Sequence, residues 1–267
     1  MHIVSIVTIS FNQAEFLERA IRSVGEQNYP DIEYIVVDPG STDSSRDIIQ
    51  RYRSRIARVI YEPDRGPADG LNKGFARATG DIFAFLNSDD VLLPGAVRSA
   101  VAFLNSNDVD VVSAHATVID AEDRHLRMAY SEPFSLKMFA YGACVLVQPS
   151  TFFSREVFER VQGFNVENKA TWDGELWVDM ALSGARFGLA HGVWSGFRLH
   201  SQSITSSKKL RQKEQEDIQR MFRKILGRDK SGIDRLVAQA CRVRKHLRSP
   251  RALYERVVRG PISGRVA

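Results

Sequence analysis

Apolar, β-branched runs alternate with amphipathic segments along the first 120 residues, and this alternation constrains the fold most strongly. Strands are predicted for IVSIVTI (3–9), EYIVVD (33–38), RVIYE (58–62), IFAFL (82–86) and DVVSAHATVI (110–119). The intervening segments 13–27, 42–54, 67–78 and 94–105 have the apolar spacing, polar starts or initial proline of helices. Strands that alternate with helices predict an α/β fold with a mostly parallel, Rossmann-like sheet flanked by helices.

The pattern is less regular after residue 120. We expect a strand over 144–154, short helices over 155–161 and 174–184, and a strand over 186–192. From about residue 206, apolar residues fall on a single helical stripe within a strongly basic sequence, which predicts amphipathic helices. The stripes consist of Ile218, Met221, Phe222, Ile225 and Leu226, and then of Ile233, Leu236, Val237, Ala240, Val243 and Leu247.

Charge divides the chain at the same point. Residues 208–267 carry 18 Lys and Arg against 6 Asp and Glu, a net charge of +12, whereas residues 1–207 carry 19 against 26, a net charge of −7. The basic tail is therefore a candidate for peripheral contact with an anionic membrane, and helices that pack on the body explain the pattern equally well. The tail helices also offer a surface for a homodimer.

The sequence offers few signs of export or membrane insertion. No stretch approaches the roughly 20 apolar residues that span a bilayer. The N-terminus has the pattern of a first strand rather than of a signal peptide. Two cysteines, Cys144 and Cys241, are too few for a disulfide framework. We therefore expect a cytoplasmic protein, peripheral on the inner face of the plasma membrane if the tail binds lipid.

Polar residues follow four of the predicted strands. They are Ser10-Phe11-Asn12, Asp38, the segment EPDRGPADG (62–70) and Asn87-Ser88-Asp89-Asp90. Ligands of open α/β sheets bind beyond the carboxyl ends of the strands. Carboxylates there suit a hard divalent cation and repel a bare phosphate. Because neither G-x-x-x-x-G-K-[ST] nor G-x-G-x-x-G follows the first strand, the residues favour a diphosphate held through a metal ion. An Asp-Asp pair after a strand is also typical of a turn or a helix cap.

Six stretches resemble family 2 glycosyltransferases, which are inverting, nucleotide-sugar-dependent enzymes of the GT-A fold. They are VTISFN (7–12), YIVVDPGSTDSS (34–45), EPDRGPADGLNKGFARATGDIFAFLNSDD (62–90), QPSTFFSREVFERVQGFN (148–165), WDGELWVDMALSGARF (172–187) and FRLHSQSIT (197–205). The resemblance implies a GT-A domain over 1–205, with a nucleotide-sugar-binding half (1–119) and an acceptor-binding half (120–205). The basic helical extension (206–267) follows it.

The resemblance also implies roles for particular residues. NSDD is similar to the family's Asp-x-Asp motif, with Asn87 where the first Asp often stands. Asp89 is then the ligand of Mn²⁺ or Mg²⁺, and His200 completes the metal or diphosphate site. WDGELW is similar to the segment that carries the catalytic base, which places Asp173 in that role and leaves Glu175 as the alternative. We expect Trp172 and Glu175 to contact the acceptor, and Trp177 to belong to the core.

The other implied contacts are with the nucleotide sugar. They are Thr8, Phe11, Asp38, Asp69, Asn72, Lys73, Asn87, Ser88 and Asp90. Pro39 stands where the family often has a second acid that contacts the base, so the identity of the base stays open.

The resemblance implies metal-dependent, inverting transfer of a sugar from a nucleotide-diphosphate sugar to a glycan or lipid-linked acceptor, in surface polysaccharide biosynthesis. Two alternatives stay open. One is a non-catalytic, degenerate sugar-nucleotide-binding protein, which Asn87 favours slightly. The other is a sugar nucleotidyltransferase, which would normally carry a Gly-rich basic loop after the first strand. A nucleic-acid partner is not expected, because the acidic strand ends would repel it.

Overall fold

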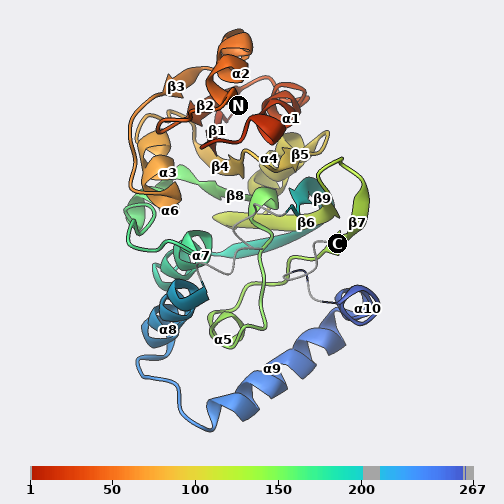
Figure 1. Ribbon diagram of the computed structural model, residues 1–267. Helices are drawn as coiled ribbons and strands as arrows, with labels where there is room; N and C mark the ends of the chain where they lie inside the picture. The colour runs from red at the N-terminus through yellow and green to blue at the C-terminus, as the bar shows by residue number, and fades with distance from the viewer. Residues whose placement is uncertain (1, 201–210, 261, 263–267) are drawn as a thin grey trace.

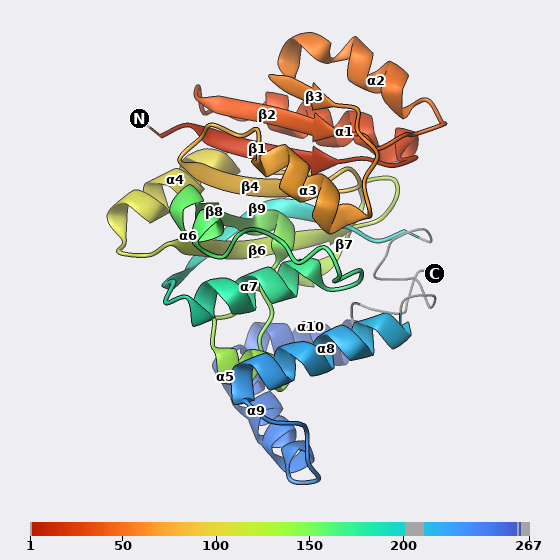
Figure 2. The same ribbon diagram turned by 90° about the vertical axis from the view of Figure 1, so that its left-hand side faces the viewer.

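The computed structural model describes residues 2–200, 211–260 and 262 (Figures 1 and 2). These residues form a mixed sheet with the strand order β3-β2-β1-β4-β8-β6-β9-β5, and β7 pairs with β6. The strands are β1 (Val4–Ile9), β2 (Ile32–Val37), β3 (Arg58–Ile60), β4 (Ile82–Asn87), β5 (Val91–Leu92), β6 (Val111–Ile119), β7 (His125–Ala129), β8 (Thr151–Ser154) and β9 (Phe187–Arg198).

The first four strands of the sheet order are parallel and end at the same edge. Ile9 of β1 is in register with Val37 of β2 and with Asn87 of β4, and Val37 pairs with Ile60 of β3. The loops that follow these strands therefore begin side by side. The expectation that the polar strand ends gather at one edge is confirmed.

The other half of the sheet is mixed. β8 is antiparallel to both β4 and β6, whereas β9 is parallel to β6 and antiparallel to β5. The predicted α/β architecture is thus confirmed, with parallel pairing concentrated in the N-terminal half.

Helices cover both faces of the sheet, as Figures 1 and 2 show. One face is covered by α1 (Ala14–Gly25), α2 (Ser45–Arg51) and α4 (Ala96–Ser106), and the other by α3 (Pro67–Phe75), α6 (Arg155–Arg160) and α7 (Trp172–Leu182). Successive side chains of β1 point to opposite faces of the sheet. Ile6 packs against the first group of helices and Val7 against the second, so each face has its own hydrophobic core. Trp177 is 1% exposed in the second core, as predicted.

The strand expected over 144–154 is only partly formed. Residues 144–147 have no regular structure, and the 3₁₀ helix η2 (Gln148–Ser150) precedes β8. Pro149 has no backbone N–H to donate to a neighbouring strand, which agrees with the interruption at η2. The structure also extends the expected strand 186–192 to Arg198, and it adds β7 and the short helix α5 (Leu136–Ala140).

The basic tail is helical, as predicted, and some of it packs on the body. It consists of α8 (Arg211–Leu226), α9 (Asp234–Arg248) and α10 (Pro250–Arg259). Phe222 of α8 and Cys241 of α9 are buried against Tyr141, beside α5, and α10 lies against β7. Among the described helices, none has both the length and the apolar character that a membrane span needs. The expected boundary between residues 205 and 206 lies outside the described residues.

Candidate active site

A cavity of about 1010 Å³ opens beyond the carboxyl ends of β1 and β4. This volume is at the upper end of what small-molecule sites have. Its wall comes from distant segments of the chain: 9–11, 87–90, the start of α7, β7, and the inner faces of α9 and α10. Seven of the residues to which the resemblance assigns a site role line it, namely Phe11, Asn87, Ser88, Asp89, Asp90, Trp172 and Asp173.

Asp89 lines this cavity and forms a close pair with His200, which does not itself belong to the lining. The Asp89 Oδ2 atom is 3.1 Å from Nε2 of His200, and the imidazole packs against the Phe16 ring with 4.4 Å between ring centroids and an angle of 43° between the ring planes. Asp89 keeps 21% of its side chain exposed, so its carboxylate is accessible to a ligand. The structure thus brings together two side chains that are 111 positions apart in the sequence.

The pair has the donor chemistry of a substrate-completed metal site. No three His, Cys, Asp or Glu side chains among the described residues converge to hold an ion unaided. Mg²⁺ and similar ions usually take one or two protein carboxylates and complete their coordination with substrate phosphates and water. Asp89 and His200 therefore fit an Mn²⁺ or Mg²⁺ ion whose remaining ligands come from a diphosphate.

Asp90 is buried and acts inside the turn. Its side chain accepts a 2.8 Å hydrogen bond from the backbone N–H of Arg198, and it lies 3.5 Å from the amide of Asn87. Burial, followed by the charge of Asp89, raises the pKa of Asp90 well above its usual value. The helix-cap interpretation does not hold, since α4 begins after Gly95 without any side-chain cap.

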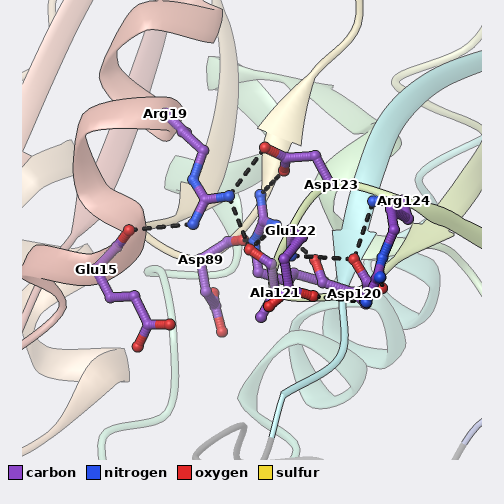
Figure 3. A network of polar contacts seen from close by, with 9 residues as sticks. Glu15, Arg19, Asp89, Asp120, Ala121, Glu122, Asp123 and Arg124 are labelled. Carbon is purple, nitrogen blue, oxygen red and sulfur yellow. Dashed lines mark hydrogen bonds and ion pairs between the residues drawn. The ribbon is translucent and has the colours of Figure 1, made fainter.

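Arg198, which was not singled out in the sequence, connects this turn to the hairpin between β6 and β7. Its guanidinium is fully buried and donates to the carbonyl oxygens of Asp89 and Asp120, each at 2.6 Å, and to the carboxylate of Asp123 at 2.5 Å. Arg19 of α1 bonds the same Asp123 at 2.9 Å. Figure 3 shows the network, in which Arg19 and Asp123 point toward each other. Four segments are thereby fixed around Asp89.

Asp173 lies in the first turn of α7 and keeps some of its surface open to the cavity. Loss of hydration among the surrounding protein atoms raises its pKa, although backbone N–H groups at the helix start partly counteract this. A raised pKa suits a carboxylate that must accept a proton near neutral pH. Trp172 beside it is mostly buried, and its Nε1 has no hydrogen-bond partner among the described residues.

Glu175 lies outside the cavity, contrary to expectation. It is 2% exposed and accepts hydrogen bonds from Arg220 at 2.7 and 3.2 Å, and from Asn168 and Asn165. Burial alone would raise the pKa of Glu175, but these donors outweigh it and hold the pKa below its usual value. The contacts fasten α8 to α7, so the structure supports neither an acceptor contact nor a catalytic base at Glu175.

Thr8 and Asp38 also lie outside the cavity lining. The Thr8 hydroxyl accepts a 3.0 Å hydrogen bond from Tyr34 within the sheet. Asp38 accepts hydrogen bonds from the N–H groups of Gly40 and Ser41 at 3.0 and 2.9 Å. Asp38 therefore shapes the loop that presents Pro39 to the cavity.

Asp69, Asn72 and Lys73 behave similarly. Asn72 exchanges two hydrogen bonds with the backbone of Phe164, and Lys73 pairs with Asp69 at 3.3 Å. None of the three lines the cavity. The nearby residues that do line the cavity are Pro63, Asp64, Gly66 and Pro67.

Sequence reasoning missed two further groups. Gln148 lines the cavity, where it accepts a 3.1 Å hydrogen bond from Asn87 and donates to the carbonyl of Phe85. Gln148 begins QPSTFFSREVFERVQGFN (148–165), one of the stretches that carry the resemblance, so the sequence did indicate this segment. The contribution of α9 and α10 to the cavity wall had no comparable signal in the sequence.

The family model of glycosyl transferase family 2 matches residues 5–162, which is more than half of the chain. The chain belongs to glycosyl transferase family 2. The family and its glycosyltransferase class, expected from the sequence motifs, are thereby confirmed. The match includes β4 and the Asp89 turn, and it ends before α7.

Curated relatives of the family 2 chain support this assignment. An uncharacterized glycosyltransferase of Nostoc sp. is 34% identical over 169 residues, which cover 59% of this chain and 52% of the relative. The chain thus spans about half the length of that relative. TuaG of Bacillus subtilis, named for teichuronic acid biosynthesis, is 28% identical over 210 residues, covering 77% of this chain and 82% of its own.

Solved structures show that the family 2 chain has the GT-A fold. TarS 1–349 of S. aureus, in complex with UDP-GlcNAc, matches with a TM-score of 0.71 at 16% identity, over 97% of this chain and 76% of TarS. The mannosyltransferase PcManGT of Pyrobaculum calidifontis, in complex with GDP-Man and Mn²⁺, matches with a TM-score of 0.66 at 21% identity, over 96% of this chain and 73% of PcManGT.

Proposed function

We propose that the protein is a metal-dependent, inverting glycosyltransferase that transfers a sugar from a nucleotide-diphosphate sugar to a glycan or lipid-linked acceptor, in surface polysaccharide biosynthesis. One observation carries the proposal: Asp89, which is paired with His200, lines the same cavity as a separate carboxylate of raised pKa, Asp173. The nucleotide sugars in the TarS and PcManGT complexes and the name of the Bacillus relative support it.

Asp89 and His200 hold the donor end in this proposal. They would bind Mn²⁺ or Mg²⁺, which supplies positive charge to a departing diphosphate. Arg198 and Asp90 keep the Asp89 turn in place through the contacts described above. The Mn²⁺ in the PcManGT complex supports this choice of ion.

Asp173 acts as the general base. It takes the proton of the acceptor hydroxyl while the oxygen attacks the sugar carbon from the face opposite the diphosphate, which inverts the anomeric centre. A positioned base of this kind contributes typically about 10²–10⁴ in rate. Trp172 lies next to it in the cavity wall and would contact the acceptor through its ring.

The outer faces of α9 and α10 dock on an anionic membrane surface. Large apolar side chains are exposed there, including Leu236 at 66% and Leu247 at 79%. The exposed charged side chains around them are basic, because Asp234 and Glu255, the only acids of these two helices, are buried. An apolar stripe bordered by arginines is complementary to anionic lipid headgroups. This contact places the enzyme on the inner face of the plasma membrane.

Nucleotide release tests the function directly. The protein is incubated with UDP-, GDP- and dTDP-sugars, with and without Mn²⁺, and free nucleoside diphosphate is measured. The proposal expects metal-dependent release from at least one donor, with little release by Asp173→Asn. Binding without release would favour the non-catalytic alternative. Formation of pyrophosphate from a nucleoside triphosphate and a sugar phosphate would favour the nucleotidyltransferase.

A further inference from the structure

The cavity has a second charged wall that the catalytic proposal does not use. The tail helices and β7 contribute three cations to it, Arg127, Lys245 and Arg256, which we call the basic wall. Elsewhere the charged lining consists of Asp64, Asp89, Asp90 and Asp173, together with the buried Arg198. The cavity therefore has two sides. Its aspartate side can bind an anion only through a metal ion, whereas the basic wall can bind an anion directly.

Arg127 is the most buried member of the basic wall. Its side chain is 9% exposed, and one terminal nitrogen donates a 2.5 Å hydrogen bond to the carbonyl of Gly260. Its Nε lies 3.8 Å from the carboxylate of Glu255, which is too long for a hydrogen bond. Within the described residues that Nε has no hydrogen-bond partner. A buried guanidinium with an unused donor is stabilised by an added oxygen acceptor.

The other two cations add charge to the same wall. Lys245 is largely buried and lies 3.0 Å from Glu132. Arg256 lines the cavity with an exposed side chain, and among the residues that the structure describes it has no ion pair or side-chain hydrogen bond. Glu132 and Glu255 are the carboxylates beside the three cations, and Glu255 also pairs with Arg259 at 3.5 Å, so the surroundings of the basic wall carry a net positive charge.

We infer that the basic wall binds a phosphate or phosphodiester group of the acceptor. The inference rests on the proposed function, because Asp173 must act on a hydroxyl of the molecule held here. Guanidinium groups bind phosphate oxygens through paired, charge-assisted hydrogen bonds. The donor diphosphate is directed to the acidic side, where a metal ion mediates its binding. An acceptor anchored by its phosphate at the basic wall lies in the cavity that Asp173 also lines.

The phosphate could belong to a lipid carrier or to a phosphate-containing polymer, and two probes separate these sources. Binding of decyl phosphate and of inorganic phosphate to the full chain is measured by calorimetry without metal. A lipid-linked phosphate predicts that decyl phosphate binds much more tightly than inorganic phosphate. A polymer phosphate predicts similar binding of the two. Failure of both probes to bind would overturn the inference.

The variants Arg127→Gln and Arg256→Gln locate the binding. Each should weaken probe binding about tenfold, the effect expected for one charge-assisted hydrogen bond. Arg58→Gln is the matched control, because Arg58 is exposed on β3 and does not line the cavity. Arg256 is exposed, so its variant should fold even if that of Arg127 does not. Unchanged probe affinity in Arg256→Gln would overturn the inference, whether or not the Arg127 variant folds.

Donor binding separates this inference from the proposed function. The same preparations are tested for thermal stabilisation by UDP-GlcNAc and GDP-Man with Mn²⁺. If a donor stabilises the protein but neither phosphate probe binds, the inferred phosphate site is wrong and the transferase proposal is unaffected. Phosphate binding by a chain that neither binds nor cleaves any donor supports the basic wall and contradicts the transferase.

Discussion

The buried guanidinium of Arg198 donates a 2.6 Å hydrogen bond to the backbone carbonyl of Asp89. This hydrogen bond holds Asp89, the proposed metal ligand, by its main chain, so the Asp89 carboxylate stays available to bind a metal ion. It also joins the last residue of β9 to the turn after β4, which are distant in the sequence.

We predict that Arg198→Lys lowers the free energy of unfolding by about 2–3 kcal/mol, because the buried carbonyls of Asp89 and Asp120 lose charge-assisted partners. Metal-dependent donor affinity should fall as well. Urea unfolding measures the first effect and calorimetry the second. Arg19→Lys is the control, since Arg19 binds the same Asp123 from a more exposed position and should cost less than about 1 kcal/mol. Equal losses in the two variants would contradict a positioning role for Arg198.

The raised pKa of Asp173 predicts the acid side of the pH–rate profile. A general base is active when ionised, so kcat/KM should fall with decreasing pH at a pH above the usual aspartate range of about 3.9. Asp173→Asn should remove this dependence and lower kcat by about 10²–10⁴. The profile is measured by nucleotide release in a series of buffers from acid to mildly alkaline pH, at fixed metal concentration. A rate that stays constant down to the usual aspartate range would argue against Asp173 as the base.

The same pKa shift makes a prediction about stability. A carboxyl whose pKa is raised on folding costs stability when it is ionised, and this cost is relieved as the pH falls toward the folded pKa. At neutral pH the uncharged Asp173→Asn variant should therefore unfold at the same temperature as the wild type or at a higher one. A large drop in the unfolding temperature would mean that Asp173 has a structural role.

Glu175→Gln should separate structure from catalysis in the segment WDGELW. Glu175 binds Arg220, Asn165 and Asn168, so the variant should lose about 1–3 kcal/mol of stability and keep kcat within a few-fold. The stabilising contribution of the ionised Glu175 is present above its unfolded pKa and is lost as the pH falls through its lower folded pKa. Glu156→Gln, in an exposed pair, is the control for stability. A loss of kcat as large as that of Asp173→Asn would restore Glu175 as a candidate base.

The exposed face of α9 predicts binding to anionic vesicles. The triple variant Leu236→Ser, Val243→Ser, Leu247→Ser should abolish flotation with vesicles rich in phosphatidylglycerol, and added salt should weaken binding of the wild type. Leu126→Ser removes an exposed apolar residue elsewhere and should have no effect. If the wild type ignores the vesicles and the triple variant converts a dimer into a monomer, the surface is a contact between two copies instead.

The strands and the polar strand ends could be predicted because their signals are local. The runs around Ile6, Ile35 and Phe85 place apolar residues on both faces of the strand, which is typical of strands covered on both faces. Parallel neighbours then bring their carboxyl ends to one edge, so the place of Asp89 followed from the fold class.

Side-chain direction was harder to predict. Asp173 and Glu175 are two positions apart on a helix, so they face different directions, and only one of them can reach the cavity. Choosing between them required knowing that Arg220 of α8 packs against Glu175. The stripes of α8 and α9 have the same pattern in the sequence, yet Phe222 is buried whereas Leu236 is exposed, since tertiary packing decides which stripe is covered.

Binding of a metal–nucleotide complex at Asp89 is the most direct test of the proposed site. The affinity for UDP and for GDP is measured by calorimetry with and without Mn²⁺, for the wild type and for the isosteric variant Asp89→Asn. The account predicts that Mn²⁺ strengthens binding of at least one nucleotide to the wild type at least tenfold, and that the variant loses this enhancement. An equal enhancement in the variant, or none in the wild type, would contradict the assignment of the site.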